Sequence, residues 1–335
     1  MRGPITSTVR RRTGALATAV LLLPGALAAQ QELPEEPVPE AQYAAPTGVD
    51  RIGRVLADVA VNDRGPYRFV VDTGANRTAI SSRLATALGL VLDPASTVEV
   101  HGITGSARVP AVSGTRLVVG EITLDPQRLP ILEDVVFADA DGILGVEGLQ
   151  NTRVEVDFEN DVVTLRPSTG RRAPAGYLVI PARLERGGLM LVRGRVGKVQ
   201  ADVILDTGAQ RTIGNLALHR ALLQSLSRED ATTATVIGAT PGVVTAIAVT
   251  TPPIAIGDAR LKDVAVTFAD LHVFSLWELL DEPALVVGMD VLGTVERFVV
   301  DYGRREFQLR PRGAEDVAVR NCNHGGCGTR LPGRR

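Results

Sequence analysis

The sequence predicts a mostly β protein built from two similar lobes. Its apolar residues occur in short runs rich in valine, leucine and isoleucine, bounded by glycine, proline, asparagine and aspartate, which is typical of strands. One tetrapeptide follows such a run twice, as Asp72-Thr73-Gly74-Ala75 and, 134 positions later (206 minus 72), as Asp206-Thr207-Gly208-Ala209. The length of 335 residues suits about two domains. These observations indicate that one folding unit occurs twice.

The similarity of the two halves extends beyond the tetrapeptide. The matched segments are Ile143-Leu144-Gly145 with Val286-Val287-Gly288, Val156-Asp157-Phe158 with Val300-Asp301-Tyr302, and Leu165-Arg166-Pro167 with Leu309-Arg310-Pro311. The offset grows along the chain, which predicts about ten additional residues in the second half. We expect them at residues 271–283, around the only tryptophan, Trp277. A duplication of this extent predicts the same fold for both halves.

Each half is predicted to begin with a hairpin that carries the tetrapeptide. Residues 55–61 and 189–196 have the composition of strands, and turns at residues 62–66 and 197–198 lead back into a second strand. That second strand runs directly into the tetrapeptide. Each aspartate is therefore expected at the end of a strand.

A short helix is predicted after each tetrapeptide. Ser82 is the expected N-cap of residues 83–88, and Gly89 follows the end of that helix. Asn215 is the expected N-cap of residues 216–223. Both helices are short, so the lobes remain mostly β.

The duplicated apolar strand running into Asp-Thr-Gly-Ala resembles the signature of the retropepsin-like aspartic proteases. The resemblance covers about residues 50–311 and implies a two-lobed acid-protease fold, in which each lobe is a closed, β-barrel-like half with short helices. It implies an aspartic endopeptidase that hydrolyses peptide bonds with a water activated between Asp72 and Asp206. Two carboxylates are needed because one group cannot both take a proton from water and donate one to the carbonyl oxygen. No metal or organic cofactor is expected.

The resemblance also implies roles for the residues near the aspartates. Support of the catalytic loops is expected from Thr73, Gly74, Ala75, Thr207, Gly208 and Ala209. The threonine hydroxyls should reach the backbone of the opposite loop, and the glycines should allow a tight turn beneath the carboxylates. The flaps that cover substrate in this family are expected at residues 101–106 and 237–242. The expected substrate contacts are Asn76, Arg77, Gln210, Arg211, Gly102, Ile103, Gly238 and Ala239.

Two arginines mark a departure from the retroviral pattern, which commonly has acidic residues at these positions. Arg77 and Arg211 either bind acidic side chains of the substrate or form ion pairs within their own lobes. For the second interpretation the expected partners are Asp157 and Asp301.

The two ends of the chain are predicted to lie outside the repeats. Arginines followed by an apolar stretch and small residues predict a signal peptide at residues 1–28, and hence a periplasmic or secreted protein. An uncleaved anchor is the alternative, although the apolar stretch is shorter than the roughly 20 residues that span a membrane. The remaining predicted segments are a Pro/Glu/Ala-rich lead-in at 29–49, repeats at 50–167 and 177–311, a linker at 168–176 and a tail at 312–335.

The tail contains both cysteines of the chain. Cys322 and Cys327 are expected to form a local disulfide in an exported protein. A metal site that also uses His324 is the alternative. The net charge of -2 gives no reason to expect a nucleic-acid partner. The expected partner is a peptide or protein substrate, with no stable membrane anchor, and a monomer is favoured over a dimer.

Two other functions remain compatible with the sequence. The same fold can serve as a catalytically inactive peptide-binding module, because fold does not determine function. Alternatively, equivalent halves of two chains can pair and form two sites per dimer. The presence of both aspartates in one chain argues against the first alternative, and the mass of the native protein would test the second.

Overall fold

The structure, a computed structural model, describes residues 44–46, 53–91, 96–185, 188–227, 231–238, 240 and 242–312. These residues belong to one compact unit that begins at Gln42. The predicted signal peptide, most of the predicted lead-in and the tail with Cys322 and Cys327 lie outside the described residues. Strands predominate and the helices are few and short, as the sequence predicts. The domain boundaries remain a prediction.

The first half forms one sheet. Its strands are β2 (Leu56–Val61), β3 (Arg64–Val71), β4 (Ala79–Ser81), β5 (Thr97–Gly102), β6 (Gly105–Val112), β7 (Leu117–Val119), β8 (Ile122–Leu124), β9 (Leu129–Leu132) and β10 (Gly142–Leu144). Their order is β5-β6-β9-β4-β10-β3-β2-β7-β8. The expected hairpin is β2 with β3, and β3 ends one residue before Asp72.

The second half repeats this sheet. Its strands are β15 (Leu189–Val196), β16 (Val199–Leu205), β17 (Ile213–Gly214), β18 (Thr232–Ile237), β19 (Val243–Thr250), β20 (Ile254–Ile256), β21 (Ala259–Leu261), β22 (Ala265–Phe268) and β23 (Ala284–Val287), with β14 (Arg183–Glu185) beside β15. The order β18-β19-β22-β17-β23-β16-β15-β20-β21 matches the first sheet strand by strand. The repetition seen in the sequence is therefore a repetition of the fold.

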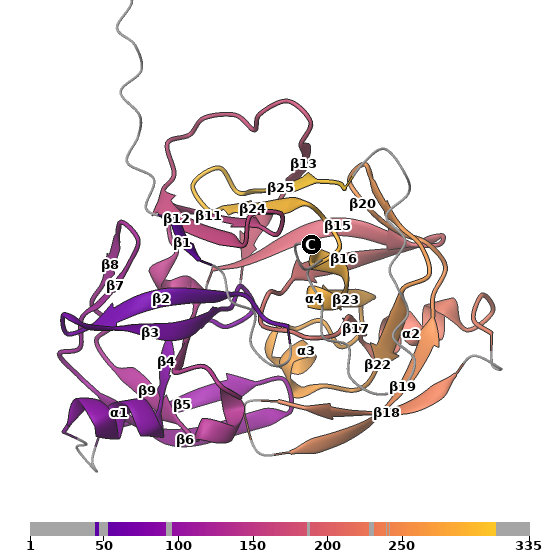
Figure 1. Cartoon of the computed structure of the whole chain (residues 1–335). Helices are drawn as coiled ribbons and strands as arrows, with labels where there is room; N and C mark the ends of the chain where they lie inside the picture. The colour runs from indigo at the N-terminus through magenta and orange to yellow at the C-terminus, as the bar shows by residue number, and fades with distance from the viewer. Residues whose placement is uncertain are drawn as a thin grey trace, which may run out of the picture. The chain divides into compact units, whose positions relative to one another are not determined.

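A third sheet takes strands from both halves. Its members are β1 (Ala44–Pro46), β11 (Thr152–Asp157), β12 (Val162–Pro167), β13 (Leu178–Pro181), β24 (Arg297–Asp301) and β25 (Glu306–Arg310), in the order β1-β12-β11-β24-β25-β13. At its centre β11 pairs antiparallel with β24, so the two halves share one continuous sheet (Figure 1). The sequence matched these segments to one another but did not predict that they pair.

The expectation of closed, β-barrel-like halves was wrong. Among the described strands, β5 and β8 end the first sheet without pairing with each other, and β18 and β21 do the same in the second. The end strands have other partners: β8 packs against β12 of the third sheet, and the β5–β6 turn contacts the β18–β19 turn. Each half is consequently an open sheet.

The helices are α1 (Ser82–Leu88), α2 (Leu216–Leu222), α3 (His272–Leu276) and α4 (Met289–Leu292), with 3-10 turns η1 (Asp134–Val136) and η2 (Val146–Gly148). Asn215 caps α2 as predicted, because its side chain accepts a hydrogen bond from Leu218 N at 2.8 Å. The predicted cap of α1 was wrong by one residue: Ser81 accepts from Leu84 N, and the Ser82 hydroxyl donates to Asp134.

The additional residues of the second half form α3 and the turn after it. Trp277, around which these residues were predicted, is 3% exposed and packs edge-on against Phe274. The addition is therefore part of the packed core of the second half.

The largest buried apolar cluster runs through both halves. It includes Val71 and Leu205, the residues that immediately precede the two aspartates. Burying a valine or leucine side chain contributes about 1.5–3 kcal/mol. The strands that carry the aspartates are thereby anchored in the core.

The buried ion pair at the junction of β11 and β24 leads to a stability prediction. Arg153 Nη1 lies 3.3 Å from Asp301 Oδ2, and the Asp301 side chain is 2% exposed. Replacing Arg153 with methionine leaves that carboxylate buried without its cation, so we expect a loss of about 3 kcal/mol in the free energy of unfolding, measured with urea. In the control, Arg68→Met, the affected pair with Asp139 is about half exposed, and a loss below about 1 kcal/mol is expected. Equal losses in the two variants would contradict this prediction.

Candidate active site

The two tetrapeptides form equivalent loops, loop 1 (residues 72–75) and loop 2 (residues 206–209). The backbone N–H of Asp72 donates to Leu144 O of β10 at 3.0 Å, and that of Asp206 donates to Val287 O of β23 at 2.9 Å. In each half the strand before the loop runs parallel to the strand that supplies this carbonyl. Each aspartate is therefore held by two strands.

The threonines of the two loops hold the halves together. Thr73 N donates to Thr207 Oγ1 and Thr207 N donates to Thr73 Oγ1, both at 3.1 Å. The Thr73 hydroxyl donates to Leu205 O at 2.6 Å, and the Thr207 hydroxyl donates to Val71 O. All of these groups are buried, where an unsatisfied partner costs about 1–3 kcal/mol. The reciprocal bonds fix the separation of the loops.

The glycines allow the carboxylates to approach each other. A Cβ atom on Gly74 would collide with the carboxylate of Asp206, and one on Gly208 would collide with that of Asp72. No side chain fits at either position without movement of the carboxylate. Glycine is thus required at both positions because a side chain would occupy the space of the opposite carboxylate.

Backbone donors orient each carboxylate in the same way. Asp72 Oδ1 accepts from Gly74 N at 2.9 Å and Ala75 N at 2.8 Å. Asp206 Oδ1 accepts from Gly208 N at 2.8 Å and Ala209 N at 3.2 Å. Each carboxylate lies against the glycine of the opposite loop, and each carboxyl group acts on the pKa of the other. Two carboxyl groups in such contact share one proton, because like charges disfavour double ionisation.

The two carboxyl groups differ in acidity. Burial raises the pKa of Asp72, and the positive charge of Arg54 acts against that rise. Burial and, next, the negative charge of Asp72 raise the pKa of Asp206 well above its ordinary value. The pair therefore titrates in two separated steps.

The raised pKa of Asp206 predicts that the dyad lowers the stability of the protein at neutral pH relative to acidic pH. An acid whose pKa is higher in the folded state destabilises it as pH rises from the ordinary pKa of the carboxyl toward the folded value. Asp206→Asn should therefore have a larger free energy of unfolding than the parent at about pH 7, measured with urea, and about the same free energy of unfolding near pH 3. The exposed control Asp125→Asn should show no such dependence. The same difference at both pH values for Asp206→Asn would contradict the explanation.

An apolar-apolar-Gly segment packs against each loop, as the resemblance implies. Gly145 and Gly288 lie so close to loop backbone that added Cβ atoms would meet the carbonyls of Ala75 and Ala209 at 2.9 and 2.8 Å. The next residues, Val146 and Met289, donate their N–H groups to those same carbonyls. These contacts hold the backbone of each loop within its own half.

The residues after the loops are exposed in both halves, namely Asn76, Arg77, Gln210 and Arg211. Arg77 and Arg211 do not pair with the partners expected from the sequence: Asp157 accepts from Arg297, and Asp301 accepts from Arg153. Each arginine instead acts on an acid of its own half. Burial raises the pKa of Glu147 and of Asp290, and the charges of Arg77 and Arg211 respectively oppose these rises.

The expected flap turns lie at the ends of two hairpins, β5–β6 and β18–β19, whose tips meet (Figure 1). The Thr104 hydroxyl donates to Thr240 O at 2.9 Å, and the Thr240 hydroxyl donates to Gly105 O at 3.1 Å. Added Cβ atoms on Gly102 and Gly238 would meet the opposite tip at 2.7 and 2.6 Å. Ala239 lies outside the described residues.

The β5–β6 hairpin also contacts the additional segment of the second half. Ile103 packs against the cluster that contains Phe274 and Trp277. The ring of His101 stacks on that of His272 in α3, with centroids 5.9 Å apart. Val236 and Ala246 of the β18–β19 hairpin belong to the same cluster, so both hairpins pack against it.

The sequence did not single out two residues near the aspartates, Arg54 and Tyr302. Arg54 is 6% exposed, and its positive charge acts on Asp72. Tyr302 is buried, and its pKa is raised by burial and by the charges of both aspartates. Comparing the matched segments residue by residue offers a signal for Tyr302, because the first half has Phe158 in its place.

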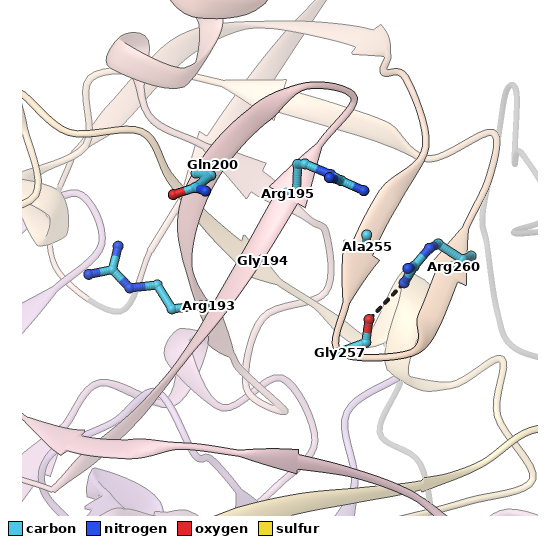
Figure 2. A pocket seen from close by; sticks show the side chains of 7 residues that line it. All are labelled: Arg193, Gly194, Arg195, Gln200, Ala255, Gly257 and Arg260. Carbon is cyan, nitrogen blue, oxygen red and sulfur yellow. Dashed lines mark hydrogen bonds between the residues drawn. The ribbon is translucent and has the colours of Figure 1, made fainter.

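A hollow of about 450 Å³ lies on β15, β16, β20 and β21, away from both loops. Figure 2 shows its lining residues, Arg193, Gly194, Arg195, Gln200, Ala255, Gly257 and Arg260. Arg260 donates to Gly257 O at 2.7 Å, and Arg193 pairs with Asp202 at 3.4 Å. None of these residues belongs to the loops or hairpin tips, so the hollow is not part of the aspartate site.

The described residues offer neither a metal site nor a membrane-spanning helix. They contain no group of three or more His, Cys, Asp or Glu side chains arranged to hold a metal ion. No helix among them has the length and apolar character needed to cross a membrane.

The duplicated sheet, the shared third sheet and the paired loops define a class of protein, the aspartic proteases with two repeats in one chain. The sequence profile described as aspartyl protease matches residues 57–147 and 192–291, which together are more than half of the chain. The chain belongs to the retropepsin-like aspartyl protease family. It is thus related to aspartic-type peptidases, which are hydrolases. A search of curated proteins found no significant match.

Proposed function

We propose that this protein is an aspartic endopeptidase that cleaves peptide bonds with a water activated between Asp72 and Asp206. The observation that carries the proposal is the contact between the two carboxyl groups, held by reciprocal threonine bonds between the loops. One group carries the shared proton and the other is ionised. This is the arrangement that combined acid and base catalysis requires.

The reaction needs no group beyond the dyad and a water. The ionised carboxylate takes a proton from the water, whose oxygen bonds to the peptide carbonyl carbon, while the other carboxyl donates its proton to the carbonyl oxygen. In the resulting gem-diol, one hydroxyl returns its proton to a carboxylate as the carbonyl forms again. The amide nitrogen takes a proton from the dyad as the C–N bond breaks. The dyad ends with one proton, as it began.

The β5–β6 and β18–β19 hairpins are proposed to act as flaps over the substrate. Their tips are joined by the Thr104 and Thr240 hydrogen bonds, so these bonds must open before a peptide chain can enter. Gly102, Ile103 and Gly238 lie at the tips and are proposed to contact substrate, together with Ala239. Expulsion of water by closed flaps would strengthen the electrostatic interactions at the dyad.

A single chain is proposed to be sufficient for activity. Both aspartates and the threonine bonds between their loops belong to one chain, so pairing with a second chain is not needed to complete the dyad. The mass of the native protein tests this against the dimer. The proposed location remains the periplasm or the extracellular space, on the basis of the N-terminal sequence.

The direct test is digestion of an unfolded protein across acidic to neutral pH, with and without an inhibitor that mimics the tetrahedral intermediate. We expect cleavage within the chain of the substrate and inhibition by the mimic. Binding of the mimic without any cleavage would favour the inactive peptide-binding module. Loss of cleavage on removal of metal ions would point to a different mechanism.

Substrate preference is expected to depend on the arginines that follow the loops. Arg77 and Arg211 are exposed, and a guanidinium can bind a carboxylate through two parallel hydrogen bonds. We expect acidic side chains near the cleaved bond to be favoured, and Arg77→Ala or Arg211→Ala to reduce that preference roughly tenfold. Cleavage of a diverse peptide library measures it, with the exposed Arg220→Ala in α2 as the control. An unchanged preference in both variants would show that the arginines act only on Glu147 and Asp290.

A further inference from the structure

The two aspartates face different residues across the hairpins that carry them. In the first half, Leu56 pairs with Val70, and Val71 N donates to Val55 O at 2.9 Å. The same register places Arg54 opposite Asp72. Opposed residues of an antiparallel pair lie about 4.5–5.5 Å apart and point to the same side.

The side chain of Arg54 lies on the face that leads to Asp72. Alternation along the strands puts Arg54 and Leu56 on one face, and Leu56 packs in a buried cluster with Val70 and Phe137. Arg54 Nη2 donates to Phe137 O at 3.0 Å, which places the guanidinium on this face. Arg54 is therefore a buried cation next to one carboxylate of the dyad.

The second half has an apolar residue at the equivalent place. Leu191 pairs with Ile204, so the same counting places Leu189 opposite Asp206. Leu189 is 0% exposed and packs in a cluster with Leu191 and Ile204. Arg54 and Leu189 are thus equivalent positions of the repeat that differ by a full charge.

A buried guanidinium beside one of two otherwise equivalent carboxyl groups removes their equivalence. Arginine remains protonated under all conditions in which the dyad titrates. Its charge favours ionisation of the carboxyl next to it, and the low dielectric of the site strengthens this effect. The hairpin of Asp206 brings no comparable charge to it. Tyr302, the other titratable group beside the dyad, is buried and interacts with both aspartates.

We propose that Arg54 is a positioning residue that keeps the negative charge of the dyad on Asp72 and the shared proton on Asp206. The proposal deepens the proposed function and rests on it for its catalytic meaning. Asp72 then takes the proton from the attacking water, and Asp206 donates its proton to the carbonyl oxygen. The two halves have equivalent loops but different roles in the first step of the reaction.

The test follows the ionisation of the dyad in the protein without substrate. The ¹³C resonances of the aspartate carboxyl carbons, assigned with Asp72→Asn and Asp206→Asn, are followed from about pH 3 to pH 9. The variants are Arg54→Leu, which copies the second half, Arg54→Gln, which keeps a donor for Phe137 O, and Arg54→Lys, which keeps the charge. Arg64→Leu is the control, because Arg64 also donates to backbone carbonyls, those of Leu88 and Ala87, at a distance from the dyad.

In the parent, Asp72 should ionise first. In Arg54→Leu and Arg54→Gln its midpoint should rise by roughly one pH unit or more. Arg54→Lys should keep most of the parent behaviour, and Arg64→Leu should keep all of it. The acidic limb of kcat/KM against pH should move by the same amount as the Asp72 midpoint.

Several results would overturn the proposal: an Asp72 midpoint unchanged in Arg54→Leu and Arg54→Gln, an equal rise in Arg54→Lys, or Asp206 ionising first in the parent. The titration does not depend on turnover. An inactive protein with the expected titration would remove the proposed function and leave the charge assignment standing. An active protein whose Asp72 midpoint is unchanged in Arg54→Leu and Arg54→Gln would remove the charge assignment and leave the proposed function standing.

Discussion

Replacing either Asp72 or Asp206 with asparagine is expected to reduce peptide cleavage by at least roughly 10²–10⁴-fold. An amide cannot take a proton from water at the pH of the reaction, and it cannot supply the exchangeable acid proton. The fold should survive, because the asparagine Oδ1 can accept the same bonds from the backbone N–H groups of its own loop. Steady-state cleavage of a peptide at several pH values, with circular dichroism for the fold, measures both expectations.

The exposed variant Asp125→Asn serves as the matched control and should keep the activity of the parent. The parent should also show a bell-shaped dependence of activity on pH, since the two carboxyl groups titrate in separate steps. A folded Asp72→Asn or Asp206→Asn protein with the turnover of the parent would exclude the dyad mechanism.

Adding a single methyl group to either loop should have a comparable effect, although both aspartates remain. In Gly74→Ala and Gly208→Ala the new Cβ atom meets the carboxylate of the opposite loop, so that carboxylate must move. The movement disrupts the close contact on which the proposed shared proton depends. We expect a loss of activity of roughly 10²-fold or more. Cleavage rate and thermal unfolding are measured on the same preparations.

Gly89→Ala is the control for the glycine variants. Gly89 is the C-cap of α1 and has a φ angle of 68°. A Cβ atom added there meets nothing within 4 Å. This substitution strains the backbone at a cost of about 1 kcal/mol of stability and should leave the cleavage rate unchanged. Full activity in Gly74→Ala or Gly208→Ala would show that the carboxyl groups do not need their close contact.

The local features of the site could be predicted from the sequence. The aspartates lie at strand ends, Asn215 caps the helix after loop 2, and the additional residues of the second half lie around Trp277, as expected. These features depend on short-range patterns: apolar strands, capping residues and a repeat that can be compared with itself. The catalytic role of Asp72 and Asp206 stays a prediction.

The relations between distant segments were decided only by the tertiary structure. The pairing of β11 with β24, the open sheets in place of closed barrels, and the partners of Asp157 and Asp301 all follow from which strands lie side by side. The position of Arg54 opposite Asp72 follows from strand pairing in the same way. Strand register decides which side chains face each other, and a shift of one residue turns every side chain to the other face. The sequence by itself therefore determined where the two aspartates and their loops lie along the chain. The register of the folded hairpins decided that a buried arginine faces one aspartate and a buried leucine faces the other.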